Sequence, residues 1–133
     1  MDAATRILIV GGMSVLFFGF VLGIPMIVTR SKAARAPRYL LAAHLAAIIQ
    51  GGLLLALTIA VGFSPLSPGA EMTAAALLVA GVTLFDLGLT ANWIQGVQDG
   101  FSENSPGSKV SGLGTPLVIV GAGILLYGVI IGL

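Results

Sequence analysis

Four long apolar segments constrain the fold of this chain more than any other feature. About 20 consecutive apolar residues allow a helix to cross the hydrocarbon core of a bilayer. The four segments are continuous rather than alternating, which excludes the pattern of membrane β-strands. With short connections between them, they predict an all-α, integral membrane four-helix bundle that forms one domain over residues 1–133. The expected transmembrane helices cover roughly 7–29, 39–62, 72–97 and 116–133.

The composition excludes several classes of function. Hydrophobic residues make up 57% of the chain and charged residues 8%, whereas a soluble domain has about 25% charged residues. A net charge of +1 gives no basic surface for nucleic acid, so lipid is the expected surrounding. The absence of cysteine excludes disulfides, thiolate catalysis, iron–sulfur clusters and cysteine-based zinc sites. The first apolar segment exceeds the roughly 7–15 residues of a signal-peptide core, so we interpret it as a retained helix.

The basic residues predict the orientation of the helices. Five of the six lysines and arginines fall in the first and third connections: Arg30, Lys32, Arg35, Arg38 and Lys109. Only Arg6 is expected at the opposite side of the membrane. Because short cytoplasmic loops carry an excess of Lys and Arg, we expect both termini to lie outside the cytoplasm, in a bacterial inner membrane.

Glycines recur with the same spacing in the first and last segments. The spacing i, i+7, i+11 joins Gly12, Gly19 and Gly23, and it also joins Gly121, Gly128 and Gly132. Glycines on one face of a membrane helix allow a second helix backbone to approach closely. The pattern therefore favours helix packing or an oligomer contact, and space for a ligand is the alternative.

Several polar residues lie within the apolar segments, and five of them are the candidate site residues: His44, Gln50, Asp86, Asn92 and Tyr127. At 1.5 Å of rise per residue, Gln50, Asp86 and Tyr127 are each expected about 16 Å from the cytoplasmic helix ends. His44 and Asn92 are expected in a shallower layer. We therefore predict that these side chains face one pocket in the cytoplasmic half of the bundle.

Each of these residues also has a structural interpretation. His44 can hydrogen-bond a neighbouring helix, or it can bind haem iron, which needs only one protein nitrogen. A zinc site would need further ligands that the chain does not supply. Asp86 has no lysine or arginine at its depth, so it either serves a ligand or acts as a neutral acid bonded to Thr or Gln. Gln50, Asn92 and Tyr127 either line the pocket or join helices.

The residues around His44 resemble a known family. Segment 38–44 (RYLLAAH), followed by Gln50-Gly51, resembles the second helix of the hydroxylaminobenzene mutases and of the related styrene oxide isomerases. Both families have an Ala-His pair with Asn-Gly six residues after the histidine. The motif Ala-Asn-Trp at 91–93 looks like one of the mutases, and the connection 105–114 is similar in character. The likeness extends over nearly the whole chain.

This resemblance implies an isomerase that rearranges a small aromatic substrate. The mutases convert an arylhydroxylamine into an aminophenol, and the isomerases convert an aryl epoxide into an aldehyde. In the isomerases a haem b lies at the interfaces of a homotrimer, and its ferric iron acts as a Lewis acid. By this likeness His44 would bind the iron, while Asp86 and Gln50 would contact the substrate. Asn92 or Tyr127 would line the pocket.

The chain departs from the family pattern at two positions, and the motif Ala-Asn-Trp at 91–93 favours the mutase reaction. Gln50 stands where the families have asparagine, and Ile94 stands where the isomerases have a tyrosine eight residues after the aspartate. The loss of that tyrosine argues against the epoxide reaction, which remains the alternative enzymatic function. A non-enzymatic four-helix membrane protein, or a carrier of small solutes, is the alternative to an enzyme.

Overall fold

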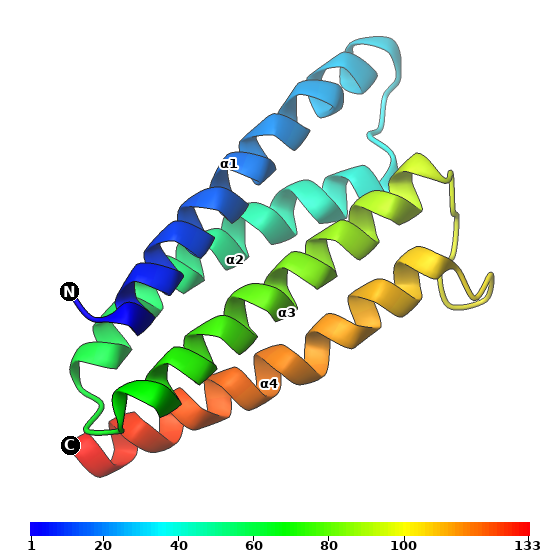
Figure 1. The fold of residues 1–133 in the computed structure, drawn as a ribbon. Helices are drawn as coiled ribbons and strands as arrows, with labels where there is room; N and C mark the ends of the chain where they lie inside the picture. Colours follow the sequence, from blue (N-terminus) through cyan, green and yellow to red (C-terminus); the bar gives the residue numbers. More distant parts are fainter.

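The computed structural model describes all 133 residues as four antiparallel helices and their connections (Figure 1). All four helices are long and apolar enough to cross a membrane. The expected all-α membrane bundle is thereby confirmed. Both termini lie at the same end of the bundle, and the connections α1–α2 and α3–α4 form the other end, here called the loop end. The helices are α1 (Ala3–Lys32), α2 (Arg38–Gly62), α3 (Pro68–Ile94) and α4 (Pro106–Gly132).

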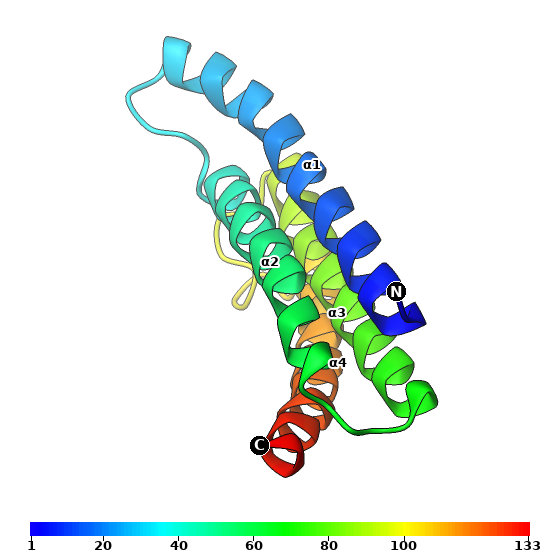
Figure 2. The same cartoon turned by 90° about the vertical axis from the view of Figure 1, so that its left-hand side faces the viewer.

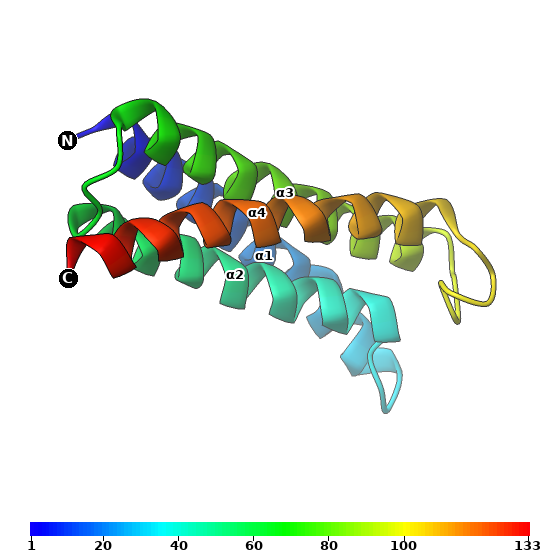
Figure 3. The ribbon, with the colours of Figure 1, turned by 90° about the horizontal axis from the view of Figure 1, so that it is seen from below.

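Helix α3 is the centre of the bundle, because it packs against each of the other three. Helices α1 and α2 form one close pair, and α3 and α4 form the other. Helices α1 and α4 do not meet, and α4 touches α2 only lightly. Figure 2 shows that α1 extends past the start of α2 at the loop end, and Figure 3 shows α4 running alongside α3 with α2 on its other side. The α1–α3 and α2–α4 sides of the bundle are therefore separate flanks.

The interior is filled by aliphatic side chains, and the outer surface is also apolar. Leu8, Leu54, Leu78 and Leu125 are among the most buried residues of the main core. Large apolar side chains cover the outside as well, as expected for helices surrounded by lipid. Because lipid is as apolar as leucine, close van der Waals packing must hold the helices together.

Glycines provide that close packing, as the sequence predicted. An added Cβ at Gly12 would lie 2.9 Å from the Gly51 carbonyl oxygen of α2, and one at Gly121 would lie 2.8 Å from the Ala74 carbonyl oxygen of α3. The glycine faces of α1 and α4 are therefore packed against other helices of the same chain. On α4 four of the five contacting glycines recur every seven residues, the period at which antiparallel helices stay in register. They are Gly107, Gly114, Gly121 and Gly128.

The expected start of the fourth helix, near residue 116, was wrong. Helix α4 begins at Pro106, because the Ser105 side chain accepts a hydrogen bond from the Ser108 N–H and caps the first turn. Proline suits that turn because it has no N–H that needs a partner. The Gly- and Ser-rich stretch predicted as a loop is helical, and Pro116 is accommodated inside the helix.

The expected end of the third helix, at Val97, was also wrong. Helix α3 ends at Ile94, because Gly96 adopts a left-handed conformation with a φ of +67°. The Gly96 N–H donates to the Trp93 carbonyl, and the Val97 N–H donates to the Asn92 carbonyl, each over 3.0 Å. This pair of bonds is the Schellman motif that terminates many helices.

The connection between α3 and α4 is ordered by its own acidic side chains. A carboxylate oxygen of Glu103 accepts hydrogen bonds of 2.9 Å from the N–H groups of Gln98 and Asp99. Backbone N–H groups of Phe101 and Ser102 point at the Asp99 carboxylate and lower its pKa below the ordinary value. These acids therefore have a structural role at the loop end.

Candidate functional site

His44 lies half-buried on α2 and bonds directly to α1. Its Nδ1 atom is 2.8 Å from the carbonyl oxygen of Gly19. A carbonyl can only accept, so Nδ1 carries the hydrogen in this bond and a neutral ring keeps a lone pair on Nε2. A Cβ at Gly23 would lie 3.4 Å from the His44 Cε1 atom, so the ring rests on the glycine face of α1. The imidazole is oriented and has one nitrogen available.

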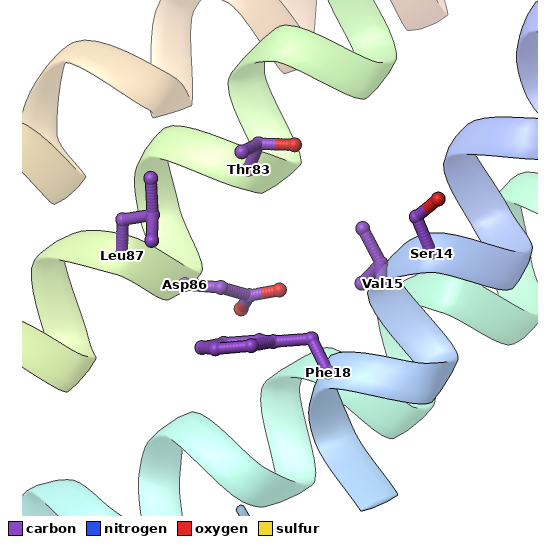
Figure 4. Close-up of a pocket in the computed structure, with 6 residues that line it drawn as sticks. All are labelled: Ser14, Val15, Phe18, Thr83, Asp86 and Leu87. Atoms are coloured by element: carbon purple, nitrogen blue, oxygen red, sulfur yellow. The ribbon is translucent and has the colours of Figure 1, made fainter. Parts of the chain in front are cut away.

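Asp86 is buried on α3 with no partner for either carboxylate oxygen. Its side chain is 2% exposed and projects from α3 toward α1, over the ring of Phe18 (Figure 4). It lines a cavity of about 220 Å³ between the two helices. An unpaired carboxylate at this depth costs stability, which makes it a candidate for ligand contact. The other lining residues are Ser14, Val15, Phe18, Thr83 and Leu87.

Gln50 lies on the other flank of the bundle. Its Oε1 atom is buried without a partner. It faces a groove between α2 and α4, where Phe85 of α3 and Thr115 of α4 are its neighbours in the wall. A separate cavity of about 410 Å³ lies nearer the loop end, and Phe85 and Thr115 line it as well. Gln50 and Asp86 therefore do not share a cavity in one chain.

Asn92 sits two residues before the end of α3 and has its polar atoms paired. Its Oδ1 accepts a 2.7 Å bond from the Ser105 hydroxyl, and its Nδ2 donates to the Ser108 hydroxyl over 3.0 Å. Beside it, the Tyr39 hydroxyl accepts a 2.8 Å bond from the Gly100 N–H. We call Tyr39, Asn92, Ser105 and Ser108 the loop-end cluster. Asn92 joins the first turn of α4 to α3, and it also lines the 410 Å³ cavity.

The expected depth of Tyr127 was wrong. It was counted from a helix start near residue 116, whereas α4 starts at Pro106 and ends at Gly132. Tyr127 lies five residues before that end and is 60% exposed. Its neighbour Gly128 packs against Ser64 in the α2–α3 connection. Tyr127 is therefore near the membrane face opposite the loop end, away from Asp86.

Within one chain, the candidate residues therefore lie in three separate places. His44 lies at the α1–α2 contact, Asp86 in the α1–α3 cavity and Gln50 in the α2–α4 groove. The sequence did not predict a role for Ser14 and Phe18, which line the same cavity as Asp86. Ser14 is the only polar side chain between residues 7 and 28, and a lone hydroxyl in an apolar helix was the available signal.

The chain contains no group of three or more His, Cys, Asp or Glu side chains that could hold a metal ion. His44 therefore stands as a single nitrogen donor. No protein-family model, curated protein or solved structure matches this chain.

Proposed function

We propose that the protein is an oligomeric membrane isomerase that converts a small arylhydroxylamine into an aminophenol, with haem iron as a Lewis acid. The observation that carries this proposal is the bond from His44 to the Gly19 carbonyl. Histidines that bind metals almost always donate their second ring N–H to a carbonyl, a carboxylate or water. This bond fixes the ring and leaves Nε2 as the atom that would bind the iron.

The donor set fits haem better than another metal group, because one histidine suffices as its protein ligand. A haem held by His44 would supply a Lewis acid that polarises the substrate oxygen. The cavities lined by Asp86 and Gln50 do not include His44. The proposal therefore includes an oligomer, a trimer by the family likeness, in which neighbouring copies complete the pocket.

The chain's own residues bind and orient the substrate in this proposal. Asp86 accepts hydrogen bonds from the substrate and stabilises positive charge that develops on it. The Gln50 amide makes a second polar contact. Apolar walls exclude water, which would otherwise react with a cationic substrate centre. Asn92 positions α4 through the loop-end cluster, and Tyr127 takes no part because of its location.

The main test is the colour and activity of protein purified in mild detergent from haem-sufficient cells. We expect haem absorption that is lost in His44→Ala and kept in Leu45→Ala, a matched change at an exposed neighbour on α2. A colourless wild-type preparation would overturn the haem assignment. Asp86→Asn should abolish turnover of phenylhydroxylamine while haem content and oligomeric state stay unchanged. Full activity would remove Asp86 from the mechanism.

The same purified protein can be used to test two alternative functions. Styrene oxide offered in parallel tests the epoxide isomerase, which would convert it to an aldehyde. A small-solute carrier or a purely structural protein is supported by the separation of Asp86 and Gln50 onto different flanks. Absence of haem and of turnover with both substrates would favour that second class.

We also propose that both termini lie outside the cytoplasm. The support is that Arg30, Lys32, Arg35, Arg38 and Lys109 all lie at the loop end, and cytoplasmic loops are enriched in such residues. Because the chain has no cysteine, Leu133→Cys introduces a unique thiol at the exposed C-terminus. It should react with a membrane-impermeant maleimide in spheroplasts, and protection from the reagent would reverse the orientation.

A further inference from the structure

The cavity between α1 and α3 gathers three polar groups that have no partner in the protein. Both oxygens of Asp86 are buried and unpaired. The hydroxyls of Ser14 and Thr83 line the same cavity, and neither donates to a helix carbonyl. Four other threonines in the helices do make such bonds, over 2.6–3.0 Å, and they are Thr29, Thr58, Thr73 and Thr90. The two hydroxyls of the cavity are thus left free for another partner.

The rest of the cavity is apolar and faces the membrane. Val15, Phe18 and Leu87 complete its wall (Figure 4). Ser14, Thr83 and Leu87 are all exposed, so the opening lies on the lipid side of the α1–α3 contact. The volume of about 220 Å³ is larger than the roughly 150 Å³ that suffices for a benzene ring. A compound with one ring can therefore enter from the bilayer.

The chain supplies no positive charge at this depth. The nearest basic residue along α1 is Arg6, which is eight residues from Ser14, or about 12 Å along the helix. The other basic residues all lie at the loop end. A buried charge without a partner is strongly unfavourable, so a cation for Asp86 has to come from a ligand.

We propose that this cavity binds a small primary organic amine as its ammonium ion. The amine enters laterally from the bilayer in its neutral form and takes the proton of the Asp86 carboxyl group, which leaves an ammonium–carboxylate pair in the cavity. An ammonium group has three N–H donors, and the cavity offers three acceptors: the Asp86 carboxylate and the hydroxyls of Ser14 and Thr83. The Thr83 hydroxyl points toward α1, while that of Ser14 must rotate about χ1 to face the carboxylate. Phe18 presents a ring to the cation, and Val15 and Leu87 contact the hydrocarbon part.

This inference rests on the proposed function in one respect, because it also takes Asp86 to be a group that contacts the ligand. The amine would then compete with the substrate of the isomerase. Binding itself needs neither haem nor turnover, so the two ideas can fail separately.

The test is calorimetric titration of benzylamine at pH 7 into the full chain in nanodiscs of zwitterionic lipid, with the heat from empty nanodiscs subtracted. We expect saturable binding of one amine per chain. Asp86→Asn should weaken it about tenfold or more, because a hydrogen bond to a charged group is lost. Thr83→Val should weaken it about threefold. The matched control is Thr73→Val, which removes an exposed hydroxyl elsewhere on α3, outside the cavity, and should leave the affinity unchanged.

Benzyl alcohol separates charge recognition from simple partition into the cavity. It has nearly the same shape without the charge, and we expect it to bind about tenfold more weakly. Equal affinity for the two compounds would overturn the ammonium assignment, and equal affinity of wild type and Asp86→Asn would overturn the site. If Asp86→Asn does not fold, the double variant Ser14→Ala/Thr83→Val keeps the carboxylate and should still bind more weakly. Unchanged affinity in that variant would also overturn the site.

The haem and turnover assays on the same preparation test the isomerase separately from the amine site. Amine binding that depends on Asp86, in a protein without haem or turnover, supports the site and rejects the isomerase. Haem and turnover without amine binding reject the site alone.

Discussion

Asn92 and Asp86 are six residues apart on α3 and are both almost fully buried, at 1% and 2% exposure, yet their surroundings differ completely. The amide of Asn92 bonds to two hydroxyls of α4, whereas neither oxygen of Asp86 has a partner. The cause is the helix opposite each residue. Gly107 lets the first turn of α4 approach Asn92, while α1 presents Val15 and Phe18 to Asp86.

The difference separates two roles for polar groups inside a membrane bundle. Paired groups hold helices together, because each buried donor and acceptor is satisfied within the protein. An unpaired group lowers the stability of the folded state, so its retention indicates a ligand or a reaction. The loop-end cluster belongs to the first class and the Asp86 cavity to the second. Three substitutions test this contrast.

The largest effect is expected for Gly107→Ala. A Cβ at this position would collide with Oδ1 of Asn92 and force α4 away from α3. We expect the free energy of unfolding in mixed detergent–SDS micelles to fall by about 3 kcal/mol. Gly112→Ala is the matched control on the same helix, where an added Cβ meets nothing within 4 Å, and it should not destabilise the protein. Equal stability of the two variants would mean that α4 does not approach Asn92 closely.

A smaller loss of stability is expected for Asn92→Ala. It removes the bonds of 2.7 Å and 3.0 Å to Ser105 and Ser108, for a loss of about 2 kcal/mol in the same unfolding measurement. Gln95→Ala, at an exposed position just after α3, should change the stability little. A double-mutant cycle with Ser105→Ala should be non-additive, because the two side chains share one bond. Strict additivity would contradict the pairing.

The smallest effect, with the opposite sign, is expected for Asp86→Leu. Replacement of an unpaired buried carboxylate by an apolar side chain removes its desolvation penalty, and the adjoining cavity leaves space for the new side chain. We expect the free energy of unfolding to rise by about 1 kcal/mol, with loss of turnover and of amine binding. A marked loss of stability would show instead that Asp86 is paired in the folded protein and, like Asn92, helps to hold the helices together.

The membrane bundle was predictable from the sequence because a bilayer leaves the chain few alternatives. Backbone N–H and C=O groups must be satisfied within the segment that crosses the lipid, so a long apolar run becomes a helix. The glycine faces were predictable for a similar reason, since close backbone approach needs small residues. The helix ends were harder to predict. Ser105 and Gly96 occupy a loop-like stretch but act as a helix start and a helix stop.

The amino-acid sequence is enough to place His44, Gln50 and Asp86 inside the membrane, because their positions along apolar segments set their depth. What each of these side chains faces depends on the packing of the helices. Helices that are apolar on all sides carry no stripe that marks their inner face, so their rotation is hidden from sequence patterns. Rotation is decided by where glycines let two backbones meet, and that packing directs Asp86 toward α1 and Gln50 toward α4.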